Sequence, residues 1–199
     1  MRVILASKSP RRREILSMLG VKFEILSADA DESSDIREPA ALVRELALRK
    51  GRATRELLQA RGEWNADTLI IASDTVVAVG GQILGKPRDA QDAKAMLRLL
   101  SGKEHQVISG VALLWGEREC ADFDTTGVRF ADMDAQEIDW YVQSGEPSDK
   151  AGAYAVQGLA SMWIKGLDGD YFNVVGLPVY KLNTLAQAHL GRKLTELHL

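Results

Sequence analysis

The segment from Thr68 to Val79 constrains the fold of this chain most strongly. It is rich in β-branched residues and nearly continuous in apolar ones, which is typical of a strand in the middle of a sheet. Asp74 interrupts the run, and a buried carboxylate is costly unless it is paired, hydrogen-bonded or bound to a metal. Since Gly80-Gly81 already supplies the turn signal, we expect a functional role for Asp74.

The N-terminal segment predicts a short strand over residues 3–5, a polar loop and the start of a helix. Ser9 suits the N-cap and Pro10 the first helical position, and Gly20 closes the helix. Lys8 and residues 11–13 place four cations at the helix start, where backbone N–H groups and the helix dipole favour an anion, phosphate above all. The alternative is a solvated basic helix start.

A long helix is predicted from Pro39 to about Ala60. Its apolar face is expected to consist of Val43, Leu46, Ala47, Ala53 and Leu57. Lys50 lies on the same face, so its side chain either extends to the edge of the core, which we favour slightly, or points into a cleft that holds an anion.

The other predicted elements mix strands and helices without strict alternation. They are a strand over 22–28, an acidic loop over 29–35, a helix after Asp89 to Leu100, strands over 105–115 and 120–130, a helix after the Asp134 capping box to about Gly145, a hairpin over 162–175 around Asp168-Gly169, and a helix from Pro178 to about Leu190. This order predicts an α/β fold with a mixed central sheet flanked by helices.

Composition narrows the function classes. The net charge of −3 argues against a general nucleic-acid coat, so we expect no stable nucleic-acid partner. One cysteine and three scattered histidines disfavour a zinc or histidine metal cage, which leaves a hard cation on carboxylates. No apolar run has the length of a membrane span, and no secretory signal is evident, so no membrane association and a cytoplasmic location are expected.

Several motifs in order along the chain together resemble the Maf family of nucleoside triphosphate pyrophosphatases. The resemblance covers Val3 to about Leu190. The motifs are Leu5-Ala-Ser-Lys-Ser-Pro-Arg-Arg-Arg13, Ala72-Ser-Asp-Thr-Val-Val77, Gly85-Lys-Pro87, Asp149-Lys-Ala-Gly-Ala-Tyr154, Gln157-Gly158 and Val175-Gly-Leu-Pro178.

The resemblance implies hydrolysis of a nucleoside triphosphate between its α and β phosphates, with a divalent cation, Mg²⁺ or Mn²⁺, as cofactor. It implies a fold related to that of inosine triphosphate pyrophosphatase, in which residues 1–199 form a single domain of two lobes with the active cleft between them. It also implies a homodimer. None of these properties follows from composition or spacing.

The same resemblance assigns candidate residues one by one. Asp74 matches the catalytic acid, described as a proton acceptor, and Glu32 matches an acidic position near the metal. Whether Asp74 deprotonates water directly or acts through the metal stays open. The substrate-binding positions are matched by Ser7, Arg12, Lys50, Lys86, Asp149 and Lys150.

Arg11, Thr75 and Gln157 match the positions at which the family's subgroups differ, and the set resembles the subgroup that acts on dTTP and UTP. An amide such as Gln157 can accept from N3–H of thymine or uracil and donate to a carbonyl. The prediction extends to modified pyrimidine nucleotides. The alternatives are the 7-methyl-GTP or UTP/CTP subgroups, a phosphatase that removes the terminal phosphate, and a non-enzymatic nucleotide-binding regulator of septum formation.

Overall fold

The computed structural model describes residues 1–197. Its strands are β1 (Arg2–Leu5), β2 (Glu24–Ile25), β3 (Thr68–Val79), β4 (Gln82–Leu84), β5 (Glu104–Trp115), β6 (Arg118–Phe130) and β7 (Ile164–Asp168). Its α-helices are α1 (Pro10–Met18), α2 (Pro39–Ala60), α3 (Ala90–Leu100), α4 (Ala135–Gln143), α5 (Tyr171–Val175) and α6 (Val179–Leu190). Short 3₁₀ helices are η1 (Glu146–Asp149), η2 (Ala151–Ala153), η3 (Leu159–Trp163) and η4 (Leu194–Glu196).

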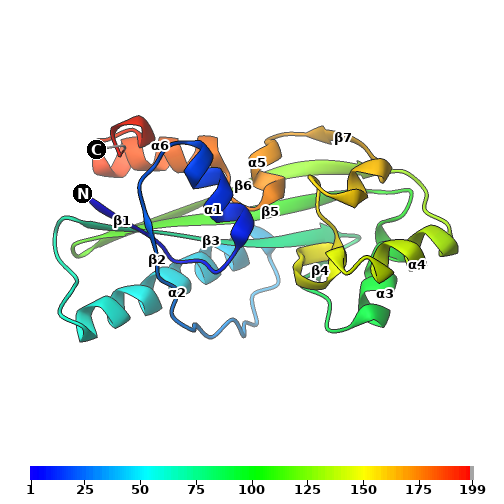
Figure 1. The fold of residues 1–199 in the computed structure, drawn as a ribbon, viewed down its shortest axis with the longest axis horizontal. Helices are drawn as coiled ribbons and strands as arrows, with labels where there is room; N and C mark the ends of the chain where they lie inside the picture. Colours follow the sequence, from blue (N-terminus) through cyan, green and yellow to red (C-terminus); the bar gives the residue numbers. More distant parts are fainter. Residues whose placement is uncertain (198–199) are drawn as a thin grey trace. The chain divides into compact units, whose positions relative to one another are not determined.

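The strands form a seven-stranded mixed sheet, in the order β2-β1-β3-β5-β6-β7, with β4 paired to β3 (Figure 1). The expected α/β class with a mixed central sheet is therefore confirmed. By contacts the chain divides into two compact units. Within the described residues, unit 1 comprises 1–74, 109–124 and 176–197, and unit 2 comprises Thr75–Ile108 and Thr125–Val175.

Unit 1 is built on parallel pairing of β1 with both β2 and β3. Its core contains Ile4, Ile70 and Leu114, each fully buried. Helix α2 packs closely at Gly110, where an added Cβ would lie 2.3 Å from the backbone oxygen of Val43. A side chain at position 110 would therefore push the helix away from β5.

Unit 2 pairs β4 with β3 and β7 with β6, both antiparallel. Its core includes the aromatic side chains of Phe130, Tyr141 and Tyr154, together with aliphatic residues of α3. His105 packs edge-on against Phe130 and Tyr154, and one of its ring nitrogens lies 2.8 Å from the Tyr154 hydroxyl. Helices α3 and α4 contact each other in this unit.

The strongest sequence patterns are confirmed. The segments 39–60 and 68–79 form α2 and β3 with the predicted bounds. Asp89 caps α3 through the N–H of Asp92 at 2.8 Å, and the capping box of Asp134 and Glu137 is present at the start of α4.

The predicted hairpin over 162–175 is wrong. Residues 164–168 form β7, but they pair with β6, and residues 171–175 form the short helix α5. The buried amide of Asn173 donates to the backbone oxygen of Val107 and to the Thr126 hydroxyl, and these bonds hold α5 in unit 2. The Asp168-Gly169 turn therefore leads into a helix.

Two further expectations need correction. The predicted strand over 22–28 shortens to Glu24–Ile25, and both of its residues are exposed. On α2, the buried face continues through Gly51, Thr54 and Leu58 instead of through Ala53 and Leu57. The prediction used steps of seven residues, and because an α-helix has 3.6 residues per turn, such a stripe drifts around the axis. Ser9 occupies the N-cap of α1 as expected, but its side chain makes no capping bond.

No helix in the described part of the chain is long and apolar enough to cross a membrane.

Candidate active site

Asp74 lies within β3 as the sequence predicts, and it is buried, with 8% of its surface exposed. The preceding β3 residues, Leu69 to Ser73, are also buried, so regular sheet pairing fixes the backbone that carries this carboxylate. The Lys50 ammonium donates a hydrogen bond to Asp74. This pairing offsets the cost of burying the carboxylate.

Lys50 links two carboxylates. Its ammonium pairs with Asp74 and lies 2.9 Å from a carboxylate oxygen of Glu32. Glu32 comes from the loop before α2, and its side chain is more exposed than the other two. The Lys50 side chain therefore points inward and pairs with two acidic side chains. The sequence had slightly favoured a side chain that extends to the edge of the core, and this expectation was wrong.

Ser7 and Arg12 form a second group in unit 1. The guanidinium of Arg12 donates to the Ser7 hydroxyl at 3.2 Å and to the backbone oxygen of Gly176 at 2.7 Å. The same oxygen accepts from the Ser73 hydroxyl at 2.9 Å. Gly176 has a φ of +122°, a conformation that favours glycine. The carbonyl at position 176 thus connects α1 to the residue before Asp74.

The charges of unit 1 influence one another. Burial lowers the pKa of Arg12, the negative charges of Asp74 and Glu32 oppose this shift, and the positive charge of Arg11 adds to it. Arginine nevertheless remains a cation in proteins. Three basic side chains, Arg11, Arg12 and Lys50, and two acidic ones therefore lie close enough to influence one another, and Lys50 pairs with both acids.

The donor set of this region fits a hard divalent cation. Glu32 and Asp74 both reach the Lys50 ammonium, so two carboxylates converge on one positive charge. Mg²⁺ is commonly held by one or two carboxylates together with waters and substrate phosphates. Within residues 1–197, no group of three or more His, Cys, Asp or Glu side chains is placed to hold a metal ion. A cation on Glu32 and Asp74 would therefore take its other ligands from phosphate and water.

Unit 2 holds a second set of the predicted residues, on loops. Lys86 follows Gly85 in the exposed loop before α3, and the Gly85 carbonyl accepts from the N–H of Gly152 at 3.0 Å. The Lys150 ammonium pairs with the Asp149 carboxylate and donates to the backbone oxygen of Glu146 at 2.6 Å. The loops of Lys86 and of the Asp149–Lys150 pair are therefore joined by a backbone hydrogen bond.

Gln157 lies exposed in a turn that is closed by the N–H of Gly158 bonding to the backbone oxygen of Ala155 at 3.1 Å. Thr75, half-buried, follows Asp74 on β3, so its side chain points to the opposite face of the sheet from that of Asp74. The three predicted specificity residues thus lie on different elements, since Arg11 belongs to α1.

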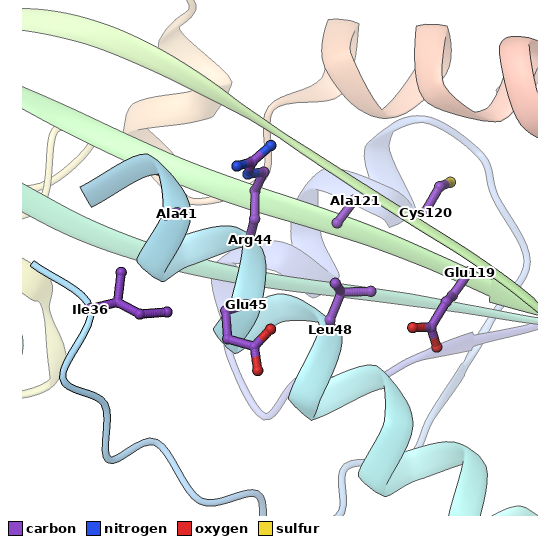
Figure 2. Close-up of a pocket in the computed structure, with 8 residues that line it drawn as sticks. All are labelled: Ile36, Ala41, Arg44, Glu45, Leu48, Glu119, Cys120 and Ala121. Atoms are coloured by element: carbon purple, nitrogen blue, oxygen red, sulfur yellow. The ribbon is translucent and has the colours of Figure 1, made fainter. Parts of the chain in front are cut away.

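A pocket of about 400 Å³ lies elsewhere in unit 1, between α2 and the start of β6 (Figure 2). Its lining includes Arg44, Glu45, Leu48, Glu119 and Cys120. None of the predicted site residues lines it. Burial raises the pKa of the Cys120 thiol to about 11, so this thiol stays protonated and unreactive at neutral pH.

Comparison with known proteins identifies the family of the chain. The family profile described as Maf-like protein matches residues 2–189. The chain belongs to the Maf family. A Maf relative from Symbiobacterium thermophilum is 45% identical over 180 residues, which cover 90% of this chain and 89% of the relative. One from Alkaliphilus oremlandii is 44% identical over 191 residues, covering 94% and 95%. One from Hahella chejuensis is 48% identical over 179 residues, covering 89% and 87%. All three are named dTTP/UTP pyrophosphatase.

The Maf motifs separate into two groups in the structure. In unit 1 the structure brings together Ser7, Arg12, Glu32, Lys50 and Asp74 through direct bonds or charge. In unit 2 it brings together the loops of Lys86 and Lys150.

Sequence reasoning missed three residues that hold these groups in place, namely Ser73, Tyr141 and Glu146. Ser73 lies inside the motif around Asp74 and could have been recognised there. Tyr141 and Glu146 lie outside the Maf motifs of this chain.

Proposed function

We propose that this Maf protein is a nucleoside triphosphate pyrophosphatase that hydrolyses dTTP and UTP to the monophosphate and pyrophosphate. The observation that carries the proposal is the buried pairing of Asp74 with Lys50, next to Glu32 and the Arg12–Ser7 group. The names of the relatives supply the substrate class. Modified pyrimidine triphosphates fall within the same proposal.

The chemistry of the bond explains why these residue types are needed. Attack at the α phosphorus builds negative charge on the pyrophosphate leaving group, and preorganised cations stabilise such charge best. Arg12, Lys50, Lys86 and Lys150 supply positive charge, and Ser7 supplies a hydroxyl donor. Asp74 accepts the proton of the attacking water, and Asp149 holds Lys150.

The proposal includes Mg²⁺ or Mn²⁺ held by Glu32 and Asp74. When bound, the cation supplies charge neutralisation of the phosphate oxygens. The two carboxylates meet at the Lys50 ammonium, so their arrangement already suits a positive charge.

Base selection is assigned to Arg11, Thr75 and Gln157. The side-chain amide of Gln157 offers both a donor and an acceptor, which matches the N3–H and carbonyl edge of uracil and thymine. A cationic methylated purine would be better served by an aromatic side chain and a carboxylate.

The proposal also retains two expectations from the sequence, a homodimer and a cytoplasmic location. Sedimentation velocity at several protein concentrations tests the first. Fractionation of cells that express the chain at its natural level tests the second.

A panel of triphosphates tests the function. The purified chain is incubated with dTTP, UTP, CTP, GTP and 7-methyl-GTP, each with Mg²⁺ or Mn²⁺, and the phosphorus products are identified by ³¹P NMR. We expect pyrophosphate, released fastest from dTTP and UTP. Faster release from GTP or 7-methyl-GTP would assign a different subgroup, orthophosphate would assign a terminal phosphatase, and tight binding without turnover would assign a regulator.

A further inference from the structure

Glu146 is the first residue of η1, and its side chain bonds to the segment that follows Gln157. Its carboxylate accepts a hydrogen bond from the Tyr141 hydroxyl at 2.7 Å. It also accepts from the backbone N–H groups of Leu159 at 2.9 Å and Ala160 at 3.4 Å. One half-buried side chain therefore anchors the segment that directly follows Gln157.

The same pair of side chains also holds the segment before Gln157. The Tyr141 hydroxyl accepts from the backbone N–H of Ala155 at 3.3 Å. Ala155 is the first residue of the turn that contains Gln157. Tyr141 and Glu146, bonded to each other, thus fix both ends of this turn, and we call them the Tyr141–Glu146 clasp.

Gly158 makes room for the clasp. An added Cβ at this position would lie 2.3 Å from one carboxylate oxygen of Glu146 and 2.4 Å from the other. Any larger residue would therefore displace the carboxylate from its bonds. The bonds of the Glu146 carboxylate therefore require a glycine at position 158, directly after Gln157.

The chemistry of the clasp requires a carboxylate. An ionised carboxylate only accepts hydrogen bonds, and here it meets only donors. Burial and the neighbouring Glu146 raise the pKa of Tyr141, so its hydroxyl stays protonated and donates. A glutamine at position 146 would turn an amide N–H₂ group toward one of these donors.

We propose that Glu146 is a positioning residue for base selection, which acts through Tyr141 and the turn to fix the amide of Gln157. This inference rests on the proposed function, since that proposal gives Gln157 its role. Gln157 itself lies exposed, so without the clasp its backbone would sample several conformations before it met a base.

The test uses Glu146→Gln and Tyr141→Phe, both of which keep the size of the side chain. We measure kcat and KM for dTTP, UTP and CTP. For both variants we expect the ratio of kcat/KM for dTTP over CTP to fall about tenfold, with kcat for dTTP within about twofold of the wild type. The change should appear as a higher KM for dTTP and UTP.

A double-mutant cycle separates positioning from general damage. In a Gln157→Ala background, Glu146→Gln should leave the dTTP/CTP ratio unchanged, because the residue it positions is gone. Ser101→Ala is the matched control, since the Ser101 hydroxyl belongs to the same unit and bonds to the backbone of Met133, accepting from its N–H at 2.8 Å. Ser101→Ala should lower the melting temperature by about as much as Glu146→Gln does, and it should leave the dTTP/CTP ratio of kcat/KM unchanged.

The outcomes distinguish the two proposals. A wild type that releases no pyrophosphate from dTTP or UTP would overturn the proposed function and this inference with it. An active wild type whose Glu146→Gln and Tyr141→Phe variants keep the dTTP/CTP ratio would overturn the inference alone. The inference alone would also be overturned if Ser101→Ala shifted the dTTP/CTP ratio as much as Glu146→Gln does. It would likewise be overturned if Glu146→Gln lowered that ratio further in the Gln157→Ala background.

Discussion

The two units hold their candidate residues in different ways. In unit 1, Asp74 and Lys50 belong to the long regular elements β3 and α2, and their side chains bond directly to each other. In unit 2, Lys86 and Gln157 stand exposed on loops, and what holds them is backbone hydrogen bonding and the Tyr141–Glu146 clasp.

This difference matches a division of labour. Charge stabilisation at a phosphorus requires groups that do not reorganise during the reaction, and buried side chains on rigid elements meet that requirement. Recognition of a base can be changed by altering a loop without rebuilding the core. We therefore expect substitutions of Asp74, Lys50 and Arg12 in unit 1 to change the rate for every nucleotide, and substitutions in the unit 2 turn to change the choice among nucleotides. Arg11 is the exception in unit 1, since we propose it for base selection.

The largest effect is expected at Asp74. Asp74→Asn removes the carboxylate that we propose as proton acceptor, and the rate of pyrophosphate release should fall about 10²–10⁴-fold for dTTP and UTP alike. The amide keeps the shape of the carboxylate, so nucleotide affinity measured by calorimetry should remain. Full activity in this variant would remove Asp74 from the mechanism.

Neighbouring arginines on α1 offer a matched pair. Arg12 donates to Ser7 and to the carbonyl of Gly176, whereas the side chain of Arg13 is exposed. Arg12→Gln should lower kcat/KM about 10²-fold for all pyrimidine triphosphates. Arg13→Gln should stay within about twofold of the wild type. If Arg13→Gln were the more harmful change, the assignment of the phosphate site would be wrong.

A smaller effect, on stability alone, is expected from His105. Burial lowers its pKa from 6.5 to about 4, so the folded state holds the neutral ring. Because the folded pKa lies below the unfolded one, this contribution to stability is fully present above pH 6.5 and is lost as the pH falls toward 4. The loss amounts to roughly 3 kcal/mol at most.

Urea unfolding at several pH values measures this effect. In His105→Gln the decline in unfolding free energy between pH 6.5 and 4 should become shallower than in the wild type. His189→Gln is the control, since His189 is exposed on α6 and should leave the curve unchanged. Equal slopes for the wild type and His105→Gln would show that His105 does not titrate with unfolding.

The sequence predicted the bounds of α2 and β3 well. Residues 39–60 and 68–79 carry strong local signals, a proline at the first helical position and a long β-branched run, so their bounds could be predicted. It also predicted a functional role for Asp74, because burying an unpaired carboxylate in an apolar strand costs free energy. Glu32, which pairs with the same lysine as Asp74, was predicted only through the family resemblance.

The rest of the fold depended on contacts distant in the chain. Residues 171–175 form α5 and not a strand, and Asn173 is tied there to Val107 and Thr126, 66 and 47 positions away. The Tyr141–Glu146 clasp was missed for the same reason. The Glu146 carboxylate accepts from the backbone N–H groups of Leu159 and Ala160, which lie 13 and 14 positions later in the chain. No local sequence pattern predicts such a bond between a side chain and a distant backbone group.

Comparison of Lys50→Gln with Gln157→Ala tests the central claim most directly. For each variant, kcat/KM is measured for dTTP and for CTP under the same conditions. We predict that Lys50→Gln lowers both values by the same factor and keeps their ratio, whereas Gln157→Ala lowers the ratio and largely keeps kcat. A changed ratio in Lys50→Gln together with an unchanged ratio in Gln157→Ala would contradict the assignment of chemistry to the Asp74–Lys50 group and of base selection to the Gln157 turn.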